Sequence, residues 1–136
     1  MSSRLKLKGR REDGRFMGIP HVVLDHPDYI GLSTKAKALL VEIAYQYNGR
    51  NNGDMTVAFK ILKERGWKRN ATISEGVKEL MNANLVVRTR EGQFQNPFSR
   101  CALYALSWQP INDFPDKDLE VRPTITPPRK FSLKKN

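Results

Sequence analysis

Residues 55–85 read MTVAFKILKERGWKRNATISEGVKELMNANL, and the spacing of their apolar side chains decides the expected fold. The pattern predicts two short amphipathic helices joined by a tight turn at Gly66. Gly76 lies within the second helix, where glycine costs about 1 kcal/mol relative to alanine, so we expect it to allow a close approach between helices. The inward-facing stripe of this second helix has i, i+4, i+7 and i+8 spacing and consists of Ile73, Val77, Leu80 and Met81.

The start of the second helix combines cationic, amide and hydroxyl side chains on the surface opposite that stripe. Lys68 and Arg69 can bind phosphates or guanine edges, whereas Asn70 can cap the helix or read adenine. Hydroxyl side chains can reach a nucleic-acid backbone or its bases. Glu75 is interpreted as a first-turn acid favoured by the helix dipole, with a cytosine contact as the alternative. The candidate contact residues on this helix are Lys68, Arg69, Asn70, Thr72, Ser74 and Lys78.

Local signals also mark the elements before this stretch. Ser33 is suited to cap a helix that runs to about Tyr47, and Gly49 is expected to stop that helix in a left-handed conformation. The first helix of the 55–85 stretch is expected to begin near Thr56. Residues 19–24 are expected to form a short extended or helical lead-in between prolines.

An arginine-rich strand–loop–strand pattern follows the second helix, with strands expected over 85–90 and 101–108. Its cations are expected to contact nucleic-acid backbone or minor groove, with protection of an edge strand as the alternative. Phe94 and Phe98 in the loop are expected to fold back on the domain, with a dimer contact or a wedge at a base step as alternatives. The candidate contact residues of this hairpin are Arg88, Arg90, Gln93, Gln95 and Arg100.

These elements predict an α+β winged helix-turn-helix domain, with three helices and a β-hairpin wing, over residues 16–110. Residues 1–15 are low in apolar content and are expected to form a flexible basic arm. Residues 111–136 are expected to form a Pro-containing basic tail with little independent structure.

The chain is strongly basic: its 136 residues include 24 Lys and Arg against 14 Asp and Glu, a net charge of +10 with a pI of about 10.0. Residues 1–15 hold six cations and two acids, residues 60–100 nine and four, and residues 116–136 six and three. This balance favours a polyanionic partner such as nucleic acid, because cations release the counterions condensed on phosphates. Arg10 and Arg11 in the arm are further candidate phosphate contacts.

Other classes of function have little support in the sequence. Asp25, His26 and Asp28 are close together, but two histidines and one cysteine are too few for an ordinary structural zinc site, so neither a metal nor another cofactor is expected. The single cysteine excludes an internal disulfide, and no apolar run resembles a signal peptide or a membrane span. We therefore expect a non-enzymatic protein of the cytoplasm or nucleoid. The aromatic residues are expected to serve core packing rather than base stacking: Tyr45, Tyr47, Trp67, Tyr104 and Trp108.

Residues 16–110 resemble small winged-helix proteins of bacterial chromosomes, prophages and plasmids. The resemblance rests on several short matches: Leu32-Ser33, Tyr47-Asn48-Gly49, Asn51-Asn52-Gly53, Gly66-Trp67, Glu79-Leu80, Leu85-Val86 and the closing Tyr104–Trp108. It implies a DNA-binding winged helix similar to transcription regulators and to the DNA-binding parts of replication initiators. Gly76 departs from the pattern, in which alanine is more typical.

The expected function is sequence-specific binding of double-stranded DNA, as in a transcription regulator, with the second helix in the major groove. A replication-initiation or partition protein of a phage or plasmid is one alternative. A module that binds an acidic protein partner is another, and RNA binding through the tails is a third. A homodimer is plausible because a single helix reads only a few base pairs.

Overall fold

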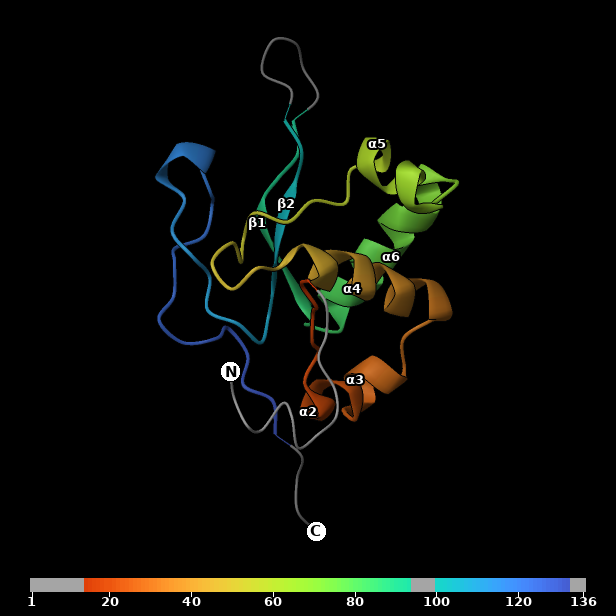
Figure 1. Cartoon of the computed structure of the whole chain (residues 1–136), viewed down its shortest axis with the longest axis horizontal. Coiled ribbons are helices and arrows are strands. Elements are labelled where there is room, and N and C mark those ends of the chain that lie inside the picture. The colour runs from red at the N-terminus through yellow and green to blue at the C-terminus, as the bar shows by residue number, and fades with distance from the viewer. Residues whose placement is uncertain (1–13, 94–99, 133–136) are drawn as a thin grey trace.

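Short helices and a two-stranded antiparallel sheet make up an α+β protein (Figure 1). The computed structural model describes residues 14–93 and 100–132. In chain order the elements are α2 (His21–Leu24), α3 (Pro27–Ile30), α4 (Thr34–Gln46), α5 (Phe59–Leu62), the 3-10 turn η1 (Lys63–Arg65), α6 (Asn70–Asn82), β1 (Val86–Arg90), β2 (Leu103–Leu106) and the 3-10 turn η2 (Pro115–Lys117).

The core lies where α4 and α6 cross and meet the hairpin (Figure 1). Ser33 caps α4 as predicted, because its Oγ accepts a hydrogen bond from the backbone N–H of Ala36 at 3.2 Å. A Cβ at Gly76 would stand 3.0 Å from Cδ2 of Leu39, so the predicted close approach of two helices is confirmed. Most of the predicted inward stripe of α6 is buried, although Met81 is only half-buried.

The hairpin is joined on its other edge by the chain before α5. β1 and β2 are antiparallel, with Val86 opposite Leu106, and both strands are shorter than predicted. On the far side of β2, Met55 and Tyr104 exchange both backbone hydrogen bonds, at 3.2 and 2.8 Å. The side chain of Asn52 extends this pairing, since its Oδ1 accepts from the N–H of Leu106 and its Nδ2 donates to the Leu106 carbonyl.

This pairing explains why the predicted helix start near Thr56 is wrong. Residues 56–58 are extended, and α5 is a single turn that begins at Phe59. The side-chain amide of Gln46 bonds both the N–H and the carbonyl of Thr56, at 3.0 and 2.8 Å, and so holds this residue in place and occupies the carbonyl that a helix would use. Gly66 has φ +97° and ends η1 at the predicted turn.

Two further helix boundaries differ from the prediction. α4 ends at Gln46, so Gly49 lies beyond its end and is not the C-terminal stop. Instead, Asn51 donates to the carbonyl of Gln46 and accepts from the N–H of Asn48, which turns the chain at that point. Asn70 is not the cap of α6 either: it is the first helical residue, and Arg69 holds the cap position without a side-chain hydrogen bond.

Residues 111–132 are called the C-terminal segment here, and they pack on the domain, contrary to the free tail that the sequence predicted. Ile111 is only 3% exposed, and Phe131 packs edge-on against His26 and Trp108. Arg129 donates to the carbonyls of Ala83 and Asn84 just after α6 and forms an ion pair with Asp28 of α3. Regular structure in the segment is limited to η2. The segment is therefore held by scattered side-chain and backbone contacts, which leave no repeating pattern in the sequence.

Candidate nucleic-acid interface

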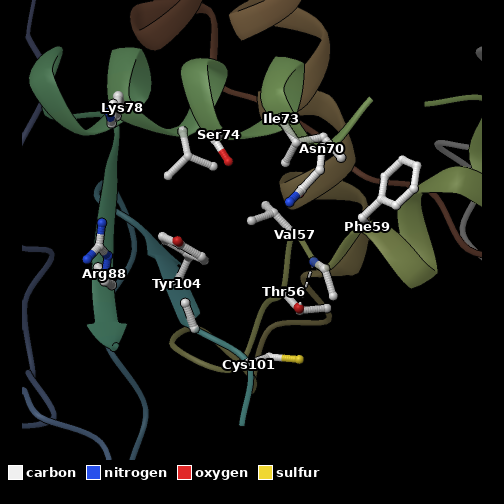
Figure 2. Close-up of a pocket in the computed structure, with 13 residues that line it drawn as sticks. Thr56, Val57, Phe59, Asn70, Ile73, Ser74, Lys78, Arg88, Cys101 and Tyr104 are labelled. Carbon is white, nitrogen blue, oxygen red and sulfur yellow. Dashed lines mark hydrogen bonds between the residues drawn. The ribbon is translucent and has the colours of Figure 1, made fainter. Parts of the chain in front are cut away.

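A groove of about 490 Å³ lies between α6, the extended segment before α5, and the hairpin (Figure 2). We refer to it as the α6–hairpin groove. Its floor is apolar and its rim is polar, with Val57, Ile73, Val77, Ala102 and Tyr104 among the apolar residues. Such a surface can take both charged and apolar groups of a partner.

The side of α6 that faces this groove carries three of the predicted contact residues. Asn70, Ser74 and Lys78 follow one another at four-residue spacing, and all three are exposed and line the groove (Figure 2). Within the described part of the chain, Lys78 has no ion-pair or hydrogen-bond partner. This row is therefore available to an external partner.

The N-terminus of α6 lies at one end of that row. Lys68 and Arg69 are exposed, and no side chain caps the helix. The first backbone N–H groups of α6 and the positive end of its dipole are consequently open to an anion. Together with Lys68 and Arg69, they make this end of the helix suitable for a phosphate.

Two other residues of α6 face elsewhere. Thr72 is half-buried and, by helical spacing, shares a flank with Glu79, which accepts hydrogen bonds from the backbone N–H and hydroxyl of Ser33, the N-cap of α4. Glu75 lies beyond the first turn and pairs with Lys35 of α4, so the interpretation as a first-turn acid is wrong. The hydrogen bond and charge of Lys35 lower the pKa of the Glu75 carboxyl.

Arg88 of β1 lies across the groove from α6 (Figure 2). Its guanidinium is exposed and pairs with Glu91 at 3.6 Å, a separation that leaves it accessible to another anion. Burial raises the pKa of the neighbouring Tyr104 hydroxyl, and the positive charge of Arg88 opposes that rise. Of the predicted hairpin cations, Arg88 is the one that faces the groove.

Arg90 and Arg100 are engaged within the molecule. Arg90 donates from Nε and Nη2 to the carbonyl of Cys101 and from Nη1 to that of Lys117. Arg100 pairs with Asp118 at 3.0 Å and Glu120 at 3.1 Å. These two arginines hold the C-terminal segment against the hairpin. The sequence predicted them as contacts to an external partner, but they have internal partners.

Of the remaining predicted contacts, only Gln93 lies within the residues that the structure describes. Gln93 pairs its backbone with Arg100, and its side chain is exposed. Gln95, Arg10 and Arg11 lie outside the described residues, as do Phe94 and Phe98.

Sequence reasoning missed the apolar half of the groove. Thr56, Val57 and Phe59 were expected to belong to a helix, so their position opposite α6 could not be anticipated. Cys101 is exposed at the groove, where the sequence predicted only strand. The prediction that Tyr45 packs in the core is also wrong. Its side chain is 54% exposed, and Cζ of Arg65 lies 4.2 Å from the centre of its ring.

The site has no marks of a metal centre: over residues 14–93 and 100–132, no three His, Cys, Asp or Glu side chains come together. None of the helices in the same ranges has the length and apolar character needed to cross a membrane. Comparison of the chain with protein-family models, with curated proteins and with solved structures gives no match.

Proposed function

We propose that residues 16–110 form a winged helix-turn-helix that binds double-stranded DNA in a sequence-specific manner, as a transcription regulator does. In this proposal α6 enters the major groove and the hairpin contacts flanking backbone or minor groove. The observation that carries it is the exposed row of Asn70, Ser74 and Lys78, which begins at an uncapped helix end beside Lys68 and Arg69. Arg88 adds a cation from the hairpin side.

The side-chain chemistry suggests that some residues position the protein on the DNA backbone and others recognise bases. Lys68 and Lys78 bind phosphates as point charges, and Arg88 binds them through its guanidinium. Arg69 and Asn70 have the forked donors and the amide that recognise guanine and adenine. Fewer hairpin cations take part than the sequence predicts, because Arg90 and Arg100 already have partners. The affinity should still fall steeply with salt, given the net charge of +10.

The test is selection of bound sequences from random duplex DNA, followed by titration at two salt concentrations with the full chain. A recovered motif is expected, together with a linear fall of log affinity against log salt. Replacing Arg69 and Asn70 with alanine should reduce discrimination at the bases that they read by about 1–3 kcal/mol each. Lys68→Ala should weaken binding to all sequences and reduce the salt slope by about 1.

Lys130→Ala is the matched control for loss of one positive charge, since Lys130 is exposed in the C-terminal segment and does not line the groove. It should leave the motif unchanged. A motif that survives the double replacement of Arg69 and Asn70 would show that α6 does not read the bases. Absence of duplex binding at low salt would reject the proposed function altogether.

A second candidate function, contact with a protein partner, is favoured by one observation. Val41 and Tyr45 of α4 and Ile61 of α5 are large apolar side chains that are 44%, 54% and 48% exposed. Exposed apolar side chains suit protein contact, in a homodimer or in a replication or partition complex of a mobile element. Sedimentation of the full chain with and without duplex DNA distinguishes a self-associating binder from a monomer.

A further inference from the structure

We propose that the α6–hairpin groove is also a binding site for a small organic anion with an apolar body, such as an aromatic carboxylate or sulfonate. The proposal rests on the proposed function in one respect only: if the exposed row on α6 binds DNA, the anion competes with DNA for it. Binding of the anion itself does not depend on DNA.

The shape of the groove fits a small molecule. Its volume of about 490 Å³ lies within the range of roughly 300–1,000 Å³ that is typical of small-molecule sites. Val57, Ile73 and Tyr104 supply an aliphatic and aromatic floor. A hydrated phosphate gains nothing from such a floor, whereas a ring or branched chain gains free energy by covering it.

The charge of the groove selects an anion over a neutral compound. Lys78 and Arg88 contribute two positive charges from opposite sides, and Asn70 and Ser74 add polar groups along one rim (Figure 2). None of the described residues that line the groove is acidic. A carboxylate or sulfonate at this rim would therefore meet two cations, one of which, Arg88, also has Glu91 beside it at 3.6 Å, while its apolar body rests on the floor.

The same side chains would serve DNA, so the two ligands exclude one another. An occupant that neutralises Lys78 and Arg88 removes two of the phosphate contacts proposed above and covers the Asn70–Lys78 side of α6. Since linkage is reciprocal, DNA must lower the affinity for the anion by the same factor. The groove would thus give the protein a response to a small acidic molecule.

The probe for the test is 1-anilinonaphthalene-8-sulfonate, an aromatic sulfonate whose fluorescence rises in apolar sites. Titration of the full chain should show saturable binding of one equivalent. Lys78→Ala and Arg88→Ala should each raise Kd about tenfold, as expected for loss of a charged hydrogen-bond partner. Lys130→Ala, the control for net charge, should change Kd less than twofold, and all three variants should keep the urea midpoint of the parent.

Two further measurements separate this site from nonspecific dye binding. The uncharged analogue N-phenyl-1-naphthylamine should bind about tenfold more weakly than the sulfonate. Cys101 is the single cysteine of the chain, is exposed and lines the groove, so saturating dye should slow its alkylation by iodoacetamide several-fold. Ala102→Trp should fill the groove and abolish both effects.

The proposal is overturned if the dye does not saturate, or if neither cation variant nor removal of the sulfonate changes its affinity. Duplex binding is measured separately by fluorescence anisotropy of labelled DNA. DNA binding without dye binding rejects the anion site alone, whereas dye binding without DNA binding rejects the proposed function alone. If both bind, displacement of the dye by duplex supports competition, and simultaneous binding overturns it.

Discussion

Replacing Asn52 with alanine should destabilise the domain more than any other single change of a polar side chain described above. Asn52 is fully buried, and its amide acts as an extra peptide group at the outer edge of β2. Oδ1 accepts from the N–H of Leu106 at 2.7 Å, and Nδ2 lies 3.0 to 3.1 Å from the carbonyls of Leu106, Gln109 and Pro110.

The loss of folding free energy depends on which hydrogen-bond partners of Asn52 water can reach once its side chain is removed. Gln109 and Pro110 are half-buried, so their carbonyls can be hydrated. Leu106 is 2% exposed; its N–H loses its partner, and its carbonyl keeps only a long bond from the N–H of Gln109, at 3.4 Å. At about 1–3 kcal/mol for an unsatisfied buried group, and less for one that keeps a long bond, Asn52→Ala should lose roughly 3 kcal/mol, or about 10–15 °C in Tm.

Urea denaturation followed by circular dichroism measures the loss. Asn51→Ala is the matched control, because Asn51 also makes two side-chain hydrogen bonds to backbone, but with groups that solvent reaches. It should cost about 1 kcal/mol or less. A loss below about 1 kcal/mol for Asn52→Ala, or one equal to the control, would refute the argument that Asn52 completes the edge of β2.

Three other outcomes are expected. Folding lowers the pKa of Glu79 through hydrogen bonds from the backbone and hydroxyl of Ser33. The ionised carboxylate therefore stabilises the fold above the usual carboxyl pKa of about 4.3, and this stabilisation is lost in acid. Glu79→Gln should flatten the fall of the urea midpoint between about pH 5 and pH 3. Gly66→Ala should lose about 1 kcal/mol because Gly66 has φ +97°, whereas Gly18→Ala should be neutral in urea denaturation. Arg129→Ala should speed subtilisin cleavage within the C-terminal segment, and an unchanged rate would show that other contacts hold it.

The parts of the fold that sequence reasoning could predict are those with a local cause. α4 and α6 have an apolar period, and Ser33 bonds an N–H only three residues away. The turn at Gly66 follows from a backbone conformation that glycine adopts readily. For the candidate site, the exposed row on α6 followed from the same helical spacing.

The parts that escaped prediction depend on side chains that bond distant backbone. Gln46 reaches Thr56, and Asn52 reaches Leu106, 54 residues away. Contacts of this kind create no repeating pattern, so the extended segment before α5 and the apolar floor that it gives the groove could not be anticipated. Arg129 orders the C-terminal segment in the same way.

Head-group chemistry separates several arginines that hold the fold together from the lysines of the candidate interface, although Lys35 and Lys117 also pair with acids. Arg90, Arg100 and Arg129 each bind two or more internal acceptors, because a planar guanidinium can satisfy two acceptors at once, and Arg65 pairs with Glu42. Lys68 and Lys78 stay at the surface as hydrated point charges. Fewer arginine side chains are therefore free to recognise bases than the net charge of the sequence suggests. If α6 reads DNA, phosphate attraction comes largely from lysines, and guanine recognition depends on Arg69, the one arginine at the start of that helix.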